Sequence, residues 1–291
     1  MARTGTESRR ACHLRGEERG KEVDKVTIGT ATVSRFILGS NPFSGFSHQG
    51  HERDREMVHY YSTARIKETL RRAEECGITT LIARGDHHVT RMLLEYWDEG
   101  GKLQWFCQTC PEVGHPERTI RKAADLGAVG CHIHGGYSDN LFANGRIEEL
   151  RPSVAVARDL GLTIGVAGHN PATLRWADEN LDVDFYMCSY YNPIERTKSP
   201  EHRPGTDERY RQVDRQAMLQ TIPTLHRPAI HYKVLGAGRN DPAEALGLVA
   251  RNLRANDAVC VGVYTGDKQD MIAEDVRLLE QAMSAVRTVS V

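Results

Sequence analysis

The stretch DLGAVGCHI, residues 125–133, contains the pattern that decides the fold: a helix end, a glycine and then a short apolar run. The same pattern occurs as ECGITTLI at 75–82 and as DLGLTIGV at 159–166. A glycine directly after a helical segment is typical of a helix C-terminus, and the apolar run is typical of a strand buried on both faces. Helix-to-strand units that recur along a chain predict a parallel sheet.

The alternation of strand and helix continues over the rest of the chain from residue 26. The predicted strands are 35–40, 79–84, 103–108, 128–134, 163–167, 185–190, 229–235 and 258–264. The predicted helices are 64–76, 89–98, 117–126, 147–160, 171–181, 214–221, 242–253 and 268–286. Eight strands that each precede a helix predict one α/β domain, a (β/α)8 TIM barrel over residues 26–291. The alternative, an open doubly wound sheet, requires a glycine-rich fingerprint that GSNPFSG at 39–45 does not fit.

Composition excludes several other classes of protein. The 291 residues carry 38 basic and 39 acidic side chains, so no basic excess indicates a nucleic-acid partner. No apolar run is long enough for a membrane span, and the polar segment 1–25 predicts a disordered leader. That segment could instead be a partner-binding arm or the product of a mis-assigned start codon. Seven cysteines, with Cys107 and Cys110 as the single CxxC pair, favour reduced thiols, no structural zinc site and a cytoplasmic protein.

Strand alternation predicts which side chains face the inside of the barrel. Because helices cover the outside, the apolar positions of each strand should face outward and the remaining positions inward. The polar residues predicted inside, or at the strand ends that open to the mouth, are Asn41, Arg84, Gln104, Gln108, His132, His134, His169, His231, Lys233 and Tyr264. Burying such groups costs several kcal/mol each unless they are paired or used, so this ring predicts an active site.

Two long connections, 40–63 and 192–213, leave strand ends on the same side of the barrel. Loops of this length in a compact barrel are typical of lids and binding loops. The carboxyl ends of the strands are also where TIM barrels build their active sites. We therefore expect both connections to border the site.

The histidines could hold a metal ion. His134 and His169 end neighbouring strands, His132 lies one layer deeper, and Asp86 follows the second strand beside His87. Two or three histidines with one carboxylate suit a catalytic divalent metal such as Zn, Fe or Mn. The alternative is a metal-free site in which neutral histidines act as acid, base or hydrogen-bond donor.

Lys233 has two possible roles inside a barrel. A desolvated lysine can serve as a base or a Schiff-base nucleophile, and a fixed ammonium can instead anchor a carboxylate or phosphate. Asn41 and Gln108 would orient the substrate. The loops after strands seven and eight, KVLGAGRND at 233–241 and YTGD at 264–267, supply residue types that bind phosphate or another anion: Gly236, Gly238, Arg239 and Gly266.

Several segments resemble the aldo/keto reductases over nearly the whole chain. KVTIGTATVSRFILGSNPFSG at 25–45 is similar to their N-terminal β-hairpin and first strand, and LTIGVAGHNPATLRWA at 162–177 to their fifth strand and helix. VDFYMCSYYNP at 183–193 resembles the sixth strand, and AVCVGVYTGDKQDMIAEDVRLLE at 258–280 the eighth strand with the helix that carries the nucleotide phosphate. The resemblance implies a barrel closed at its base by a hairpin.

The catalytic residues of that family are mostly replaced. The reductases use Asp, Tyr, Lys and His, and by strand these positions fall near Ile82, at Asp86 or His87, at Gln108 and at His134. Only His134 matches. Carbonyl reduction needs a general acid that protonates the forming alkoxide, so the usual chemistry is not expected unless His87 replaces the tyrosine.

The sequence therefore predicts an enzyme that acts on a small polar oxygenated substrate, sugar-like or acid-like. Its chemistry would be proton transfer or bond cleavage next to a carbonyl or hydroxyl, as in a lyase, isomerase or hydrolase, with or without a metal. The first alternative is an NADP(H)-dependent oxidoreductase with a rebuilt proton donor. The second is a non-catalytic barrel that binds a ligand or a partner protein.

Overall fold

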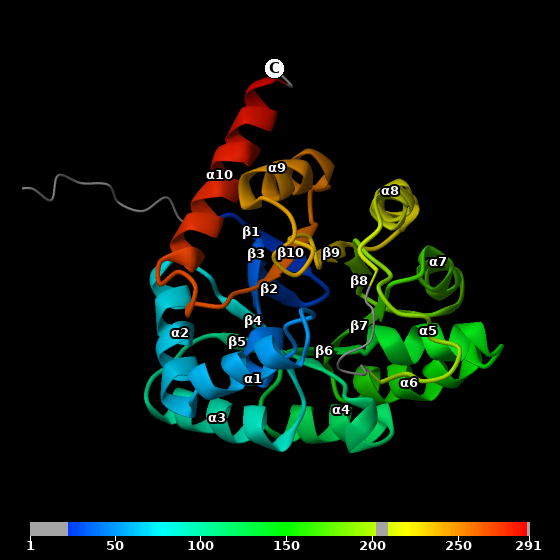
Figure 1. The fold of residues 1–291 in the computed structure, drawn as a ribbon. Helices are drawn as coiled ribbons and strands as arrows, with labels where there is room; N and C mark the ends of the chain where they lie inside the picture. The colour runs from blue at the N-terminus through cyan, green and yellow to red at the C-terminus, as the bar shows by residue number, and fades with distance from the viewer. Residues whose placement is uncertain (1–22, 202–208, 290–291) are drawn as a thin grey trace, which may run out of the picture.

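A computed structural model of the chain describes residues 23–201 and 209–289 and confirms the predicted barrel. Eight parallel strands close on themselves in chain order, with the last pairing to the first (Figure 1). The strands are β3 (Phe36–Gly39), β4 (Thr80–Arg84), β5 (Gln104–Gln108), β6 (Gly130–Ile133), β7 (Thr163–Gly168), β8 (Phe185–Ser189), β9 (Ala229–Tyr232) and β10 (Ala258–Gly262). Most of the predicted disordered leader, residues 1–22, lies outside the described residues.

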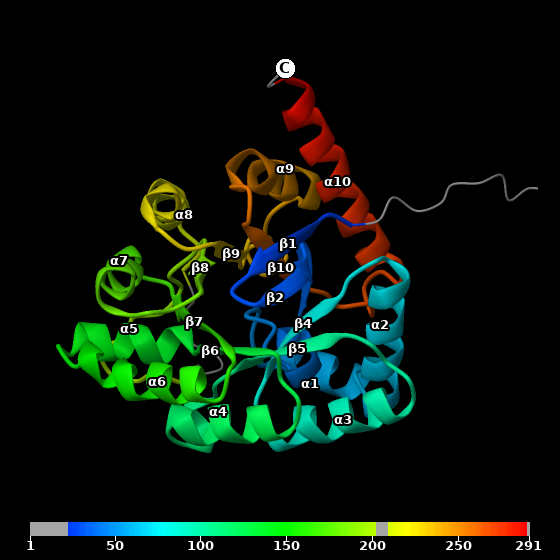
Figure 2. The same ribbon diagram turned by 180° about the vertical axis from the view of Figure 1, so that it is seen from behind.

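A short antiparallel hairpin closes the base of the barrel, as the resemblance implied. Its strands are β1 (Lys25–Ile28) and β2 (Ala31–Ser34), and Figure 2 brings them to the front. Apolar side chains of the hairpin pack with inward side chains of the barrel strands, including Ile37, Phe106 and Phe185. The lower barrel is therefore mainly an apolar core, with Gln104 donating to the Thr32 carbonyl oxygen of the hairpin at its edge.

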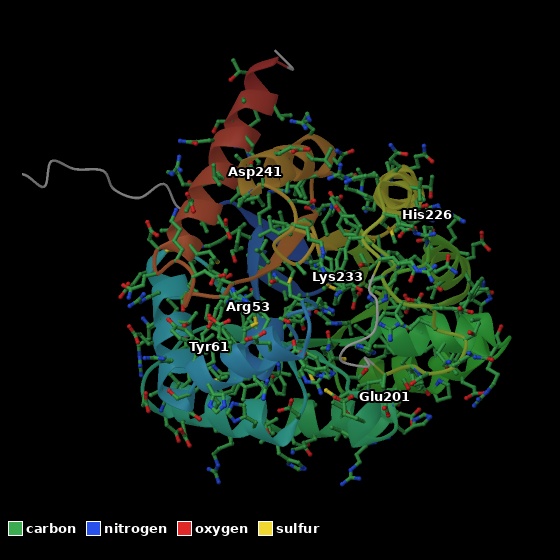
Figure 3. The ribbon with its side chains drawn as sticks, in the orientation of Figure 1. Arg53, Tyr61, Glu201, His226, Lys233 and Asp241 are labelled. Atoms are coloured by element: carbon green, nitrogen blue, oxygen red, sulfur yellow. The ribbon has the colours of Figure 1, made fainter. Side chains whose placement is uncertain are left out.

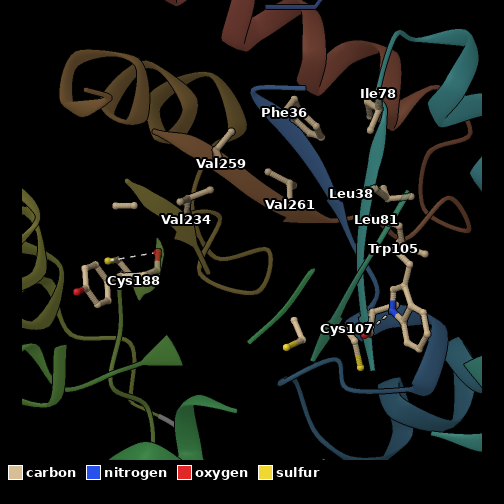
Figure 4. Close-up of a cluster of buried hydrophobic side chains, with 14 of the residues drawn as sticks. Phe36, Leu38, Ile78, Leu81, Trp105, Cys107, Cys188, Val234, Val259 and Val261 are labelled. Atoms are coloured by element: carbon tan, nitrogen blue, oxygen red, sulfur yellow. Dashed lines mark hydrogen bonds between the residues drawn. The ribbon is translucent and has the colours of Figure 1, made fainter. Parts of the chain in front are cut away.

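Helices surround the barrel where the sequence predicted them. They are α2 (Thr63–Glu75), α3 (His87–Asp98), α4 (Pro116–Asp125), α6 (Arg151–Asp159), α7 (Pro171–Asn180), α8 (Gln212–Thr221), α9 (Pro242–Asn252) and α10 (Met271–Val289). Outward strand residues such as Leu38, Trp105 and Val261 pack against this layer (Figure 4). Cys107 belongs to it, and both cysteines of the CxxC pair are buried as free thiols. Among the described helices, none combines the length and apolar character needed to span a membrane.

Two helices were not predicted, because each lacks a sequence signal. α1 (His51–Tyr60) lies in the first long connection and buries only Met57, so its sequence has no apolar stripe. α5 (Gly135–Ala143) begins with two glycines, which disfavour helix. Short 3-10 turns complete the connections: Asn41–Ser44, Pro111–Val113, Ile147–Leu150 and Ile222–Thr224.

The direction of the side chains was predicted correctly on most strands and wrongly on β9. His132 packs among inward residues, with its ring centroid 6.4 Å from that of Phe185. On β9, however, Ile230 and Tyr232 face inward, and His231 faces the helix layer. The outer layer accepts His231 because Tyr190 Oη lies 3.0 Å from its Nδ1 and the Asp257 carboxylate lies 3.5 Å from its Nε2.

Candidate active site

The polar strand ends enclose a small cavity at the mouth of the barrel. Its volume is about 60 Å³, which suits a carboxylate or carbonyl group better than a whole sugar ring. We call it the inner cavity. It is lined by Asn41, Phe46, His48, Arg84, Gln108, His132, His134, Gly135, Ala167, His169, Arg196, Tyr232 and Lys233. This lining contains three cationic side chains and four histidines but no carboxylate.

The three cations come from different parts of the chain. Arg84 ends β4 and donates to Asp86 and Glu112, which balance part of its charge. Arg196 follows β8 and is buried, with its guanidinium donating to the carbonyl oxygens of Pro200 and Glu201. Lys233 follows β9 and lies near the centre of the barrel mouth in Figure 3. Because the lining contains these three cations and no carboxylate, the inner cavity favours an anionic group.

Lys233 reaches the cavity through an unusual backbone conformation. Tyr232, the last residue of β9, faces the inside of the barrel. Strict alternation would therefore turn the side chain of residue 233 outward, toward the helices. Lys233 instead has a φ of +56°, and its Nζ lies 2.8 Å from Nε2 of His48, which has a φ of +58°. Left-handed conformations are uncommon for residues other than glycine, and such strain concentrates at functional sites.

His169 belongs to a chain of three polar side chains. Its Nδ1 donates to Asp139 Oδ2 at 2.8 Å, and both residues are buried. Its Nε2 lies 3.2 Å from the Tyr232 hydroxyl, which therefore donates to it. Burial raises the pKa of Tyr232, so this hydroxyl keeps its proton. The arrangement fixes the His169 tautomer that presents a basic nitrogen at the inner cavity.

Burial lowers the pKa of His169, while the Asp139 carboxylate opposes that shift. The pKa of His134 is lowered well below its usual value, first by burial and then by Arg196. Both imidazoles are therefore neutral at neutral pH. His134 Nδ1 has no hydrogen-bond partner among the described residues, which leaves it available to a bound group.

His132 forms the floor of the cavity, and we expect it to make stability depend on pH. Burial lowers its pKa from 6.5 to about 3. Between these pH values only the unfolded chain binds the extra proton, so the free energy of unfolding decreases as the pH is lowered. Urea unfolding at pH 7.5 and pH 5 should show about 2 kcal/mol lost through this one group. In His132→Leu the loss between the two pH values should be smaller by that amount. An equal loss in both proteins would contradict the assignment.

Gly135 and Gly136 lie in close contact with their surroundings and leave no open space at the mouth. They begin α5, and a Cβ at Gly135 would lie 3.0 Å from both His169 Cε1 and the Tyr232 hydroxyl. A Cβ at Gly136 would lie 2.4 Å from the Pro200 carbonyl oxygen and 3.0 Å from Arg196 Cζ. The glycines let α5 approach closely enough to bring Asp139 to His169.

A second and larger cavity adjoins the first. This outer cavity has a volume of about 420 Å³ and shares Asn41, Phe46, His48, Gln108, Tyr232 and Lys233 with the inner one. Tyr264 lines only the outer cavity, where its hydroxyl donates to Glu56 and its ring packs under the Arg53 guanidinium. Burial raises the pKa of Tyr264 to about 12. The volume lies within the range of ligand pockets.

The predicted anion-binding loops have structural roles of their own. Gly236 and Gly238 have φ values of +58° and +79°, which their tight turn requires. Arg239 donates to the carbonyl oxygens of Gly236 and His48 and packs over the Tyr210 ring. At Gly266 a Cβ would meet the Tyr264 ring at 2.5 Å. Of these four residues only Gly238 lines the outer cavity, so anion binding by the set remains a prediction.

Asp86 and His87, which the sequence also placed at the site, lie outside both cavities. His87 is exposed on α3, with its Nδ1 3.0 Å from Lys122 Nζ. Asp86 is the N-cap of that helix and accepts hydrogen bonds from Val89 N and Arg84 Nε. His87 therefore cannot replace the reductase tyrosine as proton donor in this arrangement.

The predicted metal set is not assembled. His132, His134 and His169 line the inner cavity without Asp86, and His169 Nδ1 is committed to Asp139. Within residues 23–201 and 209–289, no group of three or more His, Cys, Asp or Glu side chains is placed to hold a metal ion. The three cations around the cavity would also repel one. The residues present fit an anion and not a divalent cation.

Asp139, Tyr232 and Arg196 belong to the site although none was selected from the sequence. Asp139 lies on the unpredicted helix α5, and Tyr232 was assigned to the wrong face of β9. Arg196 lies in the connection after β8, whose many charged residues are typical of a solvated lid. Residues 202–208 of that connection lie outside the described residues. The polar stretch SDN at 138–140 directly after two glycines is the one signal that could have drawn attention to Asp139.

No family model matches the sequence, and no curated protein matches it significantly. Many solved structures are similar in fold, and three of them are compared with this chain below. A proposed aldo-keto reductase from Pseudomonas aeruginosa has a TM-score of 0.58 at 17% identity, with 89% of this chain and 96% of that chain covered. A variant of Gox0644 in complex with NADPH has a TM-score of 0.56 at 13% identity, with 91% and 94% covered. A truncated 3-deoxy-D-arabino-heptulosonate 7-phosphate synthase from Thermotoga maritima has a TM-score of 0.50 at 11% identity, with 92% of each chain covered.

In fold, the chain is therefore an aldo/keto reductase-like TIM barrel, which confirms the resemblance predicted from the sequence. It lacks the tyrosine and lysine that the reductases use, because Gln108 ends β5 and the turn after β4, GDHH at 85–88, contains no tyrosine. At these identities the likeness defines the fold alone. The chemistry has to be argued from the side chains.

Proposed function

We propose that the protein is an enzyme that moves a proton, or breaks a bond, next to the carbonyl or hydroxyl of a small anionic substrate. Such a reaction belongs to a lyase, an isomerase or a hydrolase. The observation that carries the proposal is the buried Asp139–His169–Tyr232 chain facing a cavity lined by three cations and no carboxylate. A base beside an anion site is what proton abstraction from a carboxylate- or phosphate-bearing molecule requires.

The anionic group of the substrate binds Lys233 and Arg196. These cations hold the substrate in place beside the base. Gln108 and Asn41 line the same cavity and orient neutral oxygens through hydrogen bonds. The inner cavity therefore receives the reacting end of the substrate.

His169 Nε2 takes the proton from the substrate. The imidazolium that forms is stabilised by the Asp139 carboxylate at 2.8 Å, which explains why that carboxylate is buried beside it. The Tyr232 hydroxyl, which donates to Nε2 in the structure, turns toward the substrate as Nε2 takes the proton. It then gives its own proton to the neighbouring atom, and the His169 imidazolium reprotonates the tyrosine. Abstraction at one atom and return at another would make an isomerase, whereas loss of a leaving group would make a lyase.

A second candidate is an NADP(H)-dependent oxidoreductase with Tyr232 as its proton donor. It is supported by the NADPH complex among the similar folds and by the size of the outer cavity. The charges of that cavity fit a polyanionic cofactor poorly. Arg53 and Lys268 are already paired with Asp267 and Glu274, and Asp275 adds a further carboxylate. We therefore rank this function second.

Proton exchange with solvent tests the proposal before the reaction is known. Small 2-oxo acids and hydroxy-oxo acids, with and without phosphate, are incubated with the protein in D2O and followed by proton NMR. We expect at least one of them to lose the signal of the hydrogen next to its carbonyl much faster than in buffer. If no acid exchanges, and NADPH fluorescence titrates with micromolar affinity, the oxidoreductase replaces the first proposal.

A further inference from the structure

Asp275 is a buried carboxylate that the proposed chemistry does not use. It lies near the start of α10, is 1% exposed and lines the outer cavity. Its Oδ2 has no hydrogen-bond partner among the described residues. Leaving a buried acceptor unpaired is costly, so such a group is retained where a ligand satisfies it.

The neighbouring carboxylates are already neutralised, and Asp275 is not. Glu274 Oε2 accepts from Lys268 Nζ at 2.7 Å, and Asp267 accepts from Arg53. Burial raises the pKa of Asp275 to about 7, which agrees with the lack of a hydrogen-bond donor to its Oδ2 among the described residues. The unmet requirement in this cavity is therefore a hydrogen-bond donor.

We propose that the outer cavity binds the hydroxylated tail of the same substrate, with a hydroxyl group of that tail donating to Asp275. This inference rests on the proposed function, because it places the acidic head in the inner cavity. The two cavities share six lining residues, so one molecule can occupy both. The substrate class is then a polyhydroxylated acid of the sugar-acid type, and not a short acid or a fatty acid.

Three acids and three variants test the assignment by calorimetric titration. Lactate fills the inner cavity alone, gluconate adds a hydroxylated tail, and hexanoate adds a tail of the same length without hydroxyls. We expect gluconate to bind the native protein about tenfold or more tighter than hexanoate does. Asp275→Asn and Asp275→Leu should lose most of that preference and bind lactate unchanged. Asp270→Asn, at an exposed aspartate at the start of the same helix, is the control and should behave as native.

Thermal unfolding separates binding from structure. Because Asp275 is buried without a partner, Asp275→Leu should melt at the same temperature as the native protein or higher. A lower melting temperature would indicate that Asp275 supports the fold, and would overturn the assignment. If gluconate and hexanoate bind equally while lactate still binds, the hydroxyl site fails and the inner anion site stands. If none of the acids binds, both proposals fail.

Discussion

We expect His169→Ala to slow proton exchange between substrate and solvent by about 10²- to 10⁴-fold. That range is what a positioned general base contributes. We assign this role to His169 and not to His134 because, of the two, only His169 is hydrogen-bonded to a carboxylate, that of Asp139, which can stabilise the imidazolium. The measurement is the NMR exchange rate with the best acid of the panel.

A matched control exists on the surface. His226 Nδ1 lies 2.7 Å from Asp178 Oδ2, much as His169 lies from Asp139, but its side chain is 86% exposed at the rim of the molecule (Figure 3). His226→Ala should leave the exchange rate unchanged. Asp139→Asn should reduce the exchange rate less than His169→Ala does. It should also move the acid limb of the pH–rate profile to lower pH, because Asp139 raises the pKa of His169. An unchanged rate in His169→Ala would contradict the enzyme proposal and favour a barrel that only binds a ligand.

The positions of His134, His169 and Gln108 could be predicted because they follow from strand periodicity alone. Each ends or follows a strand whose apolar residues clearly occupy the other face, and parallel strands in a barrel bring such ends together. On β9 the same reasoning failed, since Ile230 and Tyr232 look like outer residues and His231 like an inner one. The decisive contacts of His231, to Tyr190 and Asp257, lie 41 and 26 residues away in sequence.

Asp139 and Arg196 could not be found by periodicity, because their placement depends on contacts between distant segments. Asp139 reaches His169 only because Gly135 and Gly136 let α5 pack closely, and glycines at a helix start read as a loop. Arg196 is buried because carbonyl oxygens of its own connection accept from it. A charged side chain held by backbone oxygens leaves no pattern in the sequence, so the anion site was predicted less completely than the histidines.

The contacts in the structure also distinguish the three histidines, which the sequence alone does not. From the sequence, His132, His134 and His169 read equally well as metal ligands or as acid-base groups. The contacts separate them: His169 has an acidic partner, His134 is neutral beside Arg196, and His132 lies on an apolar floor next to Phe185. Three histidines in one cavity thus have three different environments, which favours proton chemistry over a shared metal.

Lys233→Met should weaken substrate binding about 10- to 100-fold and change the turnover rate far less. Hydrogen bonds to a charged group contribute about 1.5–3 kcal/mol, which corresponds to that range in affinity. The reason is position: Lys233 Nζ lies 2.8 Å from His48 at the boundary of the two cavities, while the base is His169. Lys102→Met, at an exposed lysine before β5, is the control and should bind substrate normally.

The KM and kcat of Lys233→Met distinguish the two roles that the sequence left open for Lys233. An anchor raises KM and leaves kcat nearly constant, whereas a base or Schiff-base nucleophile lowers kcat at unchanged KM. Borohydride treatment in the presence of a 2-oxo acid adds an independent measurement, since only a Schiff base is trapped as a covalent adduct. An adduct on Lys233, together with collapse of kcat in Lys233→Met, would overturn the anchor and make Lys233 the catalytic residue. Without an adduct, and with KM raised in both Lys233→Met and Arg196→Met, the two cations form one anion site that holds the substrate against His169.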